Sequence, residues 1–140
     1  MSEAPAVWMD LPREEHEFQF NPQRAFPNFN DAQEKRTAAN AKARSSLAPH
    51  LDLPYGEHKL RRLDIFTAMS AEKASPVHVF VHGGYWRAQD KENFAFVATE
   101  LAPRGITTVV INYELCPSST LDLVADSALA AIEWANQHVA

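Results

Sequence analysis

Residues 76–138 alternate between apolar runs that suit strands and segments whose apolar residues recur at helical spacing. The run PVHVFVH (76–82) places a valine at every second position, and ITTVVIN (106–112) is β-branched apart from its last residue, so both predict buried strands. Helical spacing follows each run, over residues 90–102 and 121–135. Because strand–helix–strand–helix order is typical of crossovers in a parallel sheet, we predict the α/β class with a mostly parallel sheet and flanking helices.

The ends of these two helices carry recognisable signals. Gly105 follows the first helix where a C-terminal cap belongs, and Ser119 with Asp122 three residues later resembles a capping box. The second helix is expected to bury one face, which consists of Leu121, Val124, Ala128, Ile132 and Ala135.

The first half of the chain predicts smaller elements. Two short strands are expected on either side of Tyr55-Gly56, and Pro54 indicates that the first of them lies at a sheet edge. Residues 31–48 predict a helix capped by Asn30, with an apolar face so thin that the helix is expected to cover another part of the molecule. Residues 1–30 hold four prolines between aromatic residues, which predicts an irregular arm. We therefore divide the chain into an arm with a covering helix (1–50) and a sheet-bearing domain (51–140).

Composition narrows the function. A length of 140 residues with 46% hydrophobic content suits one modest domain, and a net charge of −5 argues against a nucleic-acid partner. The single cysteine, Cys116, forms no intrachain disulfide, and no metal, nucleotide or flavin motif is present, so no metal or cofactor is predicted. The N-terminus has acids and prolines where a signal peptide needs a basic and an apolar stretch, and no apolar run approaches about 18 residues. These features predict a cytoplasmic protein without a membrane segment.

The segment VFVHGGYWR (79–87) is the part of the sequence that points to a functional site. The chain has only four glycines, yet Gly83 and Gly84 are adjacent and directly follow an apolar strand. Two residues without side chains allow the backbone to turn back with its amide hydrogens facing a cavity, a geometry that suits stabilisation of a carbonyl oxygen as it becomes negative. The alternative is a tight strand-to-helix turn with no chemical role.

HGGYW, with the later NYELCP (112–117) and FNPQRAFPNF (20–29), resembles the α/β-hydrolase fold and, within it, the kynurenine formamidase and carboxylesterase branch. The resemblance covers the chain from about Phe18 onward. It implies that Gly83, Gly84 and Tyr85 form the oxyanion hole, and that His82, Tyr85 and Trp86 shape the substrate pocket, with His82 bracing the loop. It also implies that the arm and first helix cover the site. The implied substrate is a small acyl ester or an N-formylkynurenine-like formamide.

The resemblance also implies a serine nucleophile on a G-x-S-x-G elbow, followed by an acid and a histidine. No two glycines of this chain lie four residues apart, so no such elbow is present, and no catalytic residue can be named. We expect the chain to be the N-terminal half of a serine hydrolase and to be inactive alone. A binding module without catalysis and one chain of a split hydrolase remain alternatives.

In the strand order that the resemblance implies, residues 77–82 form an apolar open edge of the sheet. Such edges pair with other chains. We therefore expect a homo-oligomer or association with a missing C-terminal half.

Overall fold

The computed structural model describes residues 10–70 and 75–139. Its internal contacts define two compact units, Met1–Lys35 and Arg36–Ala140, which are described separately below. The division falls inside a helix, upstream of the boundary at residue 50, where the sequence pattern changes from helical to strand spacing.

The first unit is helical where the sequence predicted an irregular arm. It contains α1 (Arg13–Phe20), α2 (Pro22–Ala25) and the start of α3 (Phe29–Ser46). The prediction was wrong for the described residues because Pro12 and Pro22 lie at helix starts, where a missing N–H costs nothing, and Pro27 lies in the turn before α3; Pro5 lies outside the described residues. Pro12 directly precedes α1, and Pro22 is the first residue of α2, whose N-terminus is capped by the side chain of Asn21.

Helix α3 begins earlier than predicted. The amide N–H of Ala32 donates to the carbonyl of Asn28 at 3.0 Å, so Asn30 lies inside the first turn and is not the cap. The sequence placed the cap too late because several polar residues compete at this position.

The second unit is built on a four-stranded sheet with strand order β1-β2-β4-β3. The predicted hairpin is present, with β1 (His50–Pro54) at one edge, antiparallel to β2 (Arg62–Phe66). Strand β2 is also antiparallel to β4 (Thr107–Ile111), and only β3 (Val77–Val81) and β4 run parallel. The α/β class is thus confirmed, but in the described residues the sheet is mixed rather than mostly parallel. A hairpin with a short loop forces antiparallel pairing, whereas a parallel pair needs a long crossover.

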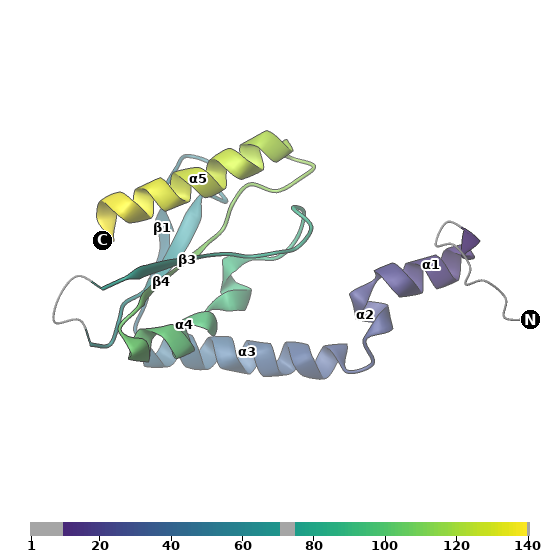
Figure 1. Ribbon diagram of the computed structural model, residues 1–140, viewed down its shortest axis with the longest axis horizontal. Helices are drawn as coiled ribbons and strands as arrows, with labels where there is room; N and C mark the ends of the chain where they lie inside the picture. Colours follow the sequence, from purple (N-terminus) through teal and green to yellow (C-terminus); the bar gives the residue numbers. More distant parts are fainter. Residues whose placement is uncertain (1–9, 71–74, 140) are drawn as a thin grey trace, which may run out of the picture. The chain divides into compact units, whose positions relative to one another are not determined.

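Helices cover both faces of this sheet (Figure 1). Helix α5 (Leu121–His138) packs on one face, where its residues Val124, Ala131 and Ala135 join a core with sheet residues Leu63, Ile65, Val109 and Ile111. On the other face, Ala43 of α3 and Ala98 of α4 (Val97–Leu101) pack with Phe66 and Val110. The two cores take alternate residues of the same strands, as the two-residue period of a strand requires.

The predicted helix over residues 90–102 is broken into shorter pieces. It consists of a 3₁₀ turn η2 (Lys91–Phe94), then α4, then a second 3₁₀ turn η3 (Ala102–Arg104). Gly105 ends this segment with φ +77°, as its predicted capping role requires.

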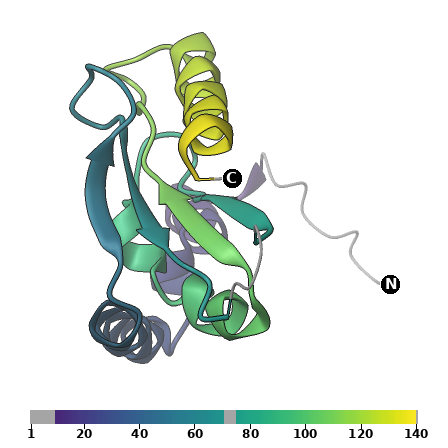
Figure 2. The same cartoon turned by 90° about the vertical axis from the view of Figure 1, so that its left-hand side faces the viewer.

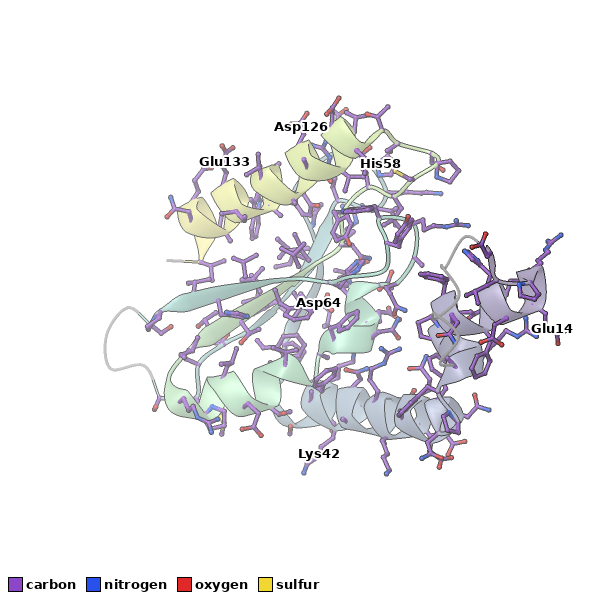
Figure 3. All side chains as sticks on the ribbon, turned by 45° about the vertical axis from the view of Figure 1, so that its right-hand side comes forward. Glu14, Lys42, His58, Asp64, Asp126 and Glu133 are labelled. Atoms are coloured by element: carbon purple, nitrogen blue, oxygen red, sulfur yellow. The ribbon has the colours of Figure 1, made fainter. Side chains whose placement is uncertain are left out.

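Helix α5 differs from prediction at its start and along its face. Its N-cap is Thr120, because the hydroxyl of Ser119 donates to the Glu114 carboxylate instead. Leu121 and Ile132 are exposed, whereas Ser127, which the apolar pattern left out, is fully buried. In Figure 3 the labelled Asp126 and Glu133 point away from the sheet, consistent with a polar outer face.

Strand β3 forms the second edge of the sheet, beside β4 (Figure 2). The sequence predicted a mostly buried strand, yet Val77 and Val79 are half-buried and Val81 is 45% exposed. The prediction was wrong because β3 has a pairing strand on one side only within the described residues.

A buried cluster of charges lies on the α3 and α4 side of the sheet. Asp64 of β2, labelled in Figure 3, is fully buried and its carboxylate lies 2.8 Å from the ammonium of Lys91 and 3.3 Å from the guanidinium of Arg44. The amide N–H of Asp52 also donates to it at 2.8 Å. The cluster therefore links β1, β2, α3 and η2. Removing one of its members would leave a buried charge without a partner and destabilise the folded state.

Within the described residues, every helix is too short or too polar to cross a lipid bilayer.

Two adjacent threonines of β4 give a stability prediction. The buried hydroxyl of Thr108 has no hydrogen-bond partner among the described residues, whereas that of Thr107 accepts from the Ala68 amide at 3.2 Å and contacts the Ser75 hydroxyl at 2.9 Å. We expect Thr108→Val to raise the free energy of unfolding by about 1–3 kcal/mol, because it replaces an unsatisfied polar group with an isosteric methyl. Thr107→Val should lower it by a similar amount. Urea denaturation of both variants tests this; a Thr108→Val protein less stable than the original would contradict it.

Candidate active site

The site forms where β3 and β4 end. Their parallel register pairs Val81 with Ile111, so the loop that follows β3 starts beside the segment that follows β4. Crevices at the carboxyl ends of parallel strands are the usual ligand sites of such sheets. A pocket of about 520 Å³ opens here, and its lining consists of residues 81–86, Tyr113, and the α5 residues Leu121, Val124, Ala125 and Ala128.

The structure brings all of the predicted site residues into this one pocket. His82, Gly83, Gly84, Tyr85 and Trp86 form its loop side. Tyr85 is 79% exposed and Trp86 is 51% exposed, so both present large apolar surfaces at its mouth.

The loop turns through left-handed backbone geometry. The φ angles are +126° at Gly84, +57° at Tyr85 and +59° at Trp86. The amides of Arg87 and Ala88 close the turn by donating to the Gly84 carbonyl at 3.2 and 3.1 Å. For a residue other than glycine, this conformation costs of order 1–3 kcal/mol of free energy. It is retained only where neighbouring contacts hold the residue in place.

Three main-chain N–H groups of this loop make no hydrogen bond to the protein within the described residues. Within the described residues, the N–H groups of Gly83, Gly84 and Tyr85 donate to no protein acceptor, although all three residues line the pocket. Gly83 and Tyr85 are exposed and Gly84 is half-buried, so the three donors face solvent or the pocket rather than the core. They are available to a ligand that carries an acceptor oxygen.

The two glycines differ in the room that a side chain would have. A Cβ atom on Gly84 would lie 2.2 Å from the carbonyl oxygen of Ala88, so no other residue fits the turn. A Cβ atom on Gly83 would meet nothing within 4 Å. Gly84 thus shapes the turn, whereas Gly83 leaves the space beside its amide open.

His82 is buried beneath the loop. Its ring stacks on Tyr113, with centroids 4.4 Å apart, and on Phe94, with centroids 5.7 Å apart. Its Nδ1 atom lies 2.7 Å from the Gly83 carbonyl oxygen, and since a carbonyl can only accept, Nδ1 is the protonated donor. This geometry suits a brace for the loop better than a proton-transfer group.

The segment after β4 holds the loop from the other side. The hydroxyl of Tyr113 donates to the His82 carbonyl, and the amide of Cys116 donates to the Trp86 carbonyl at 2.8 Å. Burial raises the pKa of Tyr113, so the phenol stays protonated and remains a donor. Sequence reasoning missed Tyr113 as a pocket residue, although its place directly after a strand parallel to β3 was a usable signal.

Glu114 fixes the same segment in place. Its carboxylate accepts from the Ser119 hydroxyl at 2.7 Å and from the Arg61 guanidinium at 2.9 Å, and its amide donates to the Ser127 hydroxyl at 3.1 Å. The hydrogen bond from Ser119, followed by that from Arg61, lowers the pKa of Glu114, which is therefore ionised at neutral pH. Residues 112–116 thus form a firm support behind the loop.

The lining of the pocket sets limits on its chemistry. It contains no serine, cysteine, aspartate or glutamate, and its one histidine is occupied with the Gly83 carbonyl. In the part of the chain that the structure describes, no three His, Cys, Asp or Glu residues lie close enough to hold a metal ion. The arrangement can bind an acceptor oxygen and an apolar group.

Solved structures with the same arrangement have the α/β-hydrolase fold. A Silicibacter protein assigned as a thioesterase superposes with a TM-score of 0.76 at 26% identity, over 86% of this chain and 46% of that one. The esterase LipW of Mycobacterium marinum superposes with a TM-score of 0.57 at 18% identity, over 94% of this chain and 44% of that one. The chain is therefore a part of an α/β-hydrolase fold, as the sequence predicted.

Residues 63–140 match the BD-FAE family, and the chain belongs to this family. It is also 28% identical to kynurenine formamidase of Danio rerio over 131 residues, which are 89% of this chain and 45% of that protein. A probable isoprenylcysteine alpha-carbonyl methylesterase of Oryza sativa subsp. japonica is 37% identical over 75 residues, which are 53% of this chain and 18% of that protein. The chain thus spans less than half the length of these curated relatives.

The two glycines give a matched pair of variants. Gly84→Ala should lower the free energy of unfolding by at least about 1–3 kcal/mol, because the new methyl group meets the Ala88 carbonyl and alanine is strained at φ +126°. Gly83→Ala should stay within about 1 kcal/mol of the original protein, because its methyl group enters open space. Urea denaturation compares the two, and equal losses would contradict the proposed division of roles.

Proposed function

We propose that this chain carries the oxyanion-hole side of a hydrolase site that acts on a formamide or a carboxylic ester. The amides of Gly83, Gly84 and Tyr85 would receive the carbonyl oxygen of the substrate. In acyl transfer this oxygen gains negative charge, and one preplaced donor contributes roughly 100- to 1000-fold in rate. The observation that carries the proposal is that these three amides line a pocket and have no acceptor within the described residues.

The other walls of the pocket favour an apolar or aryl acyl compound. Tyr85, Trp86 and Tyr113 supply aromatic surface, and α5 contributes Leu121, Val124 and small alanines. Pockets of this kind bind a ligand through apolar contact and orient it with a few polar groups. The names of the relatives, kynurenine formamidase and methylesterase, support a formamide or an ester, and the site does not favour one over the other.

In this proposal, His82 and Trp86 do not exchange protons with the substrate. His82 braces the loop through its stacked ring and its bond to Gly83, while Trp86 and Tyr85 form the wall that contacts the acyl or aryl group. The nucleophile, acid and base of a complete site would come from sequence that follows the matched region in the relatives.

A second candidate function is binding without catalysis. It is favoured by the absence of serine, cysteine, aspartate and glutamate from the residues that line the pocket. One chain of a split hydrolase would show the same lining, with the attacking group supplied by a second polypeptide. Binding and turnover must therefore be measured separately.

Binding is tested by an NMR titration of the ¹⁵N-labelled chain with formanilide and, as a matched control without a carbonyl group, ethylbenzene. We expect formanilide to shift the amide signals of Gly83, Gly84 and Tyr85 downfield in the proton dimension, because they donate to its carbonyl oxygen. Ethylbenzene should shift only signals near the aromatic and α5 walls. Identical shift patterns for the two compounds would contradict the oxyanion-hole assignment and leave an apolar binding pocket.

Turnover is tested by incubating the purified chain with p-nitrophenyl acetate and with an N-formyl arylamine. We expect no hydrolysis rate above that of buffer, because hydrogen-bond donors stabilise the transition state but cannot replace the missing nucleophile. Hydrolysis that is lost in Gly84→Val would show that a nucleophile is present in this chain after all.

A further inference from the structure

Asn112 lies outside the pocket, yet it contacts the far end of the loop that forms it. The side-chain oxygen Oδ1 accepts from the amide of Lys91 at 2.7 Å, and Nδ2 donates to Oδ2 of Asp90 at 2.8 Å. The loop that begins at His82 is thus held at its start by Tyr113 and at its end by Asn112.

The position of Asn112 is itself fixed by its main chain. Its N–H donates to the Arg62 carbonyl at 2.8 Å, and its carbonyl accepts from the Tyr55 hydroxyl at 2.5 Å. Burial raises the pKa of Tyr55 to about 12, so this donor is retained at any physiological pH. Asn112 is only 6% exposed, and the donor and acceptor groups of both its main chain and its side chain are in use.

The chemistry of the contact requires a donor and an acceptor on one short side chain. Oδ1 of Asp90 already accepts from the Glu92 amide at 2.9 Å, which holds that carboxylate in place at the start of η2. An aspartate at position 112 would have no proton for the Asp90 carboxylate and would place a second negative charge against it. An asparagine supplies both groups without charge.

We propose that Asn112 is a positioning residue: together with Asp90 it sets the geometry of the loop 83–90 and thereby the direction of the Gly83, Gly84 and Tyr85 amides. The effect of Asn112 on the loop is independent of the proposed function. Its importance for catalysis rests on the proposed function. The contact needs one amide and one carboxylate, so the two residues can exchange roles. In the double variant, the carboxylate introduced at position 112 accepts from the Lys91 amide and from the side-chain amide introduced at position 90. The oxygen of that side-chain amide still caps Glu92.

The test compares Asn112→Asp, Asp90→Asn and the swapped double variant Asn112→Asp/Asp90→Asn, with Asn136→Asp on the exposed surface of α5 as the control for added charge. Hydrogen exchange is followed at the amides of Arg87 and Ala88, which close the loop turn, and at those of Val109 and Ile111 in β4. We expect Asn112→Asp to accelerate exchange in the loop by about tenfold or more relative to β4, as the loss of a charge-assisted hydrogen bond predicts. The swapped variant should return to within about threefold of the original protein, by restoration of that bond.

Asp90→Ser gives an independent variant if Asn112→Asp fails to fold. Serine keeps the cap on Glu92 but has no second oxygen for Asn112, so it should loosen the loop and spare the sheet. Equal acceleration in loop and strands, or no rescue by the swap, would overturn the proposal and leave Asn112 as an ordinary stabilising residue.

The formanilide titration separates this inference from the proposed function. In Asn112→Asp the shifts at Gly83 and Gly84 should weaken, and in the swapped variant they should return. If formanilide shifts no amide even in the original protein while the exchange pattern holds, the proposed function fails and the positioning role stands.

Discussion

The site depends on the parallel pairing of β3 with β4. Because Val81 lies opposite Ile111, the chain leaves both strands at the same edge, and the segments 82–90 and 112–116 run beside each other. Everything that shapes the pocket follows from this register. A shift of one residue would turn the valines of β3 to the other face and move Tyr113 and Asn112 away from the loop they hold.

The loop and the segment after β4 act as one unit. The loop carries the strained backbone and the unused amides, and residues 112–116 carry the donors and acceptors that hold it. Glu114, in turn, is held by Arg61 and Ser119, and the buried Asp64 holds Lys91. A motif that the sequence shows only as a resemblance thus has a physical role, which is to support a turn that is unfavourable by itself.

Much of this could be predicted from residue patterns. The strands were found because alternation and β-branching are local signals, and the pocket loop was found because two glycines after a strand stand out in a chain with so few. The helix ends were less predictable, since Ser119 and Asn30 both resemble caps and only tertiary contacts show that Ser119 bonds to Glu114 and that the turn starts at Asn28. The break in the segment 90–102 and the buried Ser127 likewise depend on contacts with distant residues. The role of Asn112 was missed for the same reason, because its partners lie more than twenty residues away in the sequence.

The left-handed turn at Gly84, Tyr85 and Trp86 also bears on the order in which this chain acquires its structure. Positive φ is locally unfavourable at Tyr85 and Trp86, and the groups that hold the turn, such as the Tyr113 hydroxyl, are separated from it by the whole crossover. Closing such a separation costs chain entropy before any contact can compensate for it. We therefore expect the loop to form late, so that substitutions in it alter the rate of unfolding more than the rate of folding.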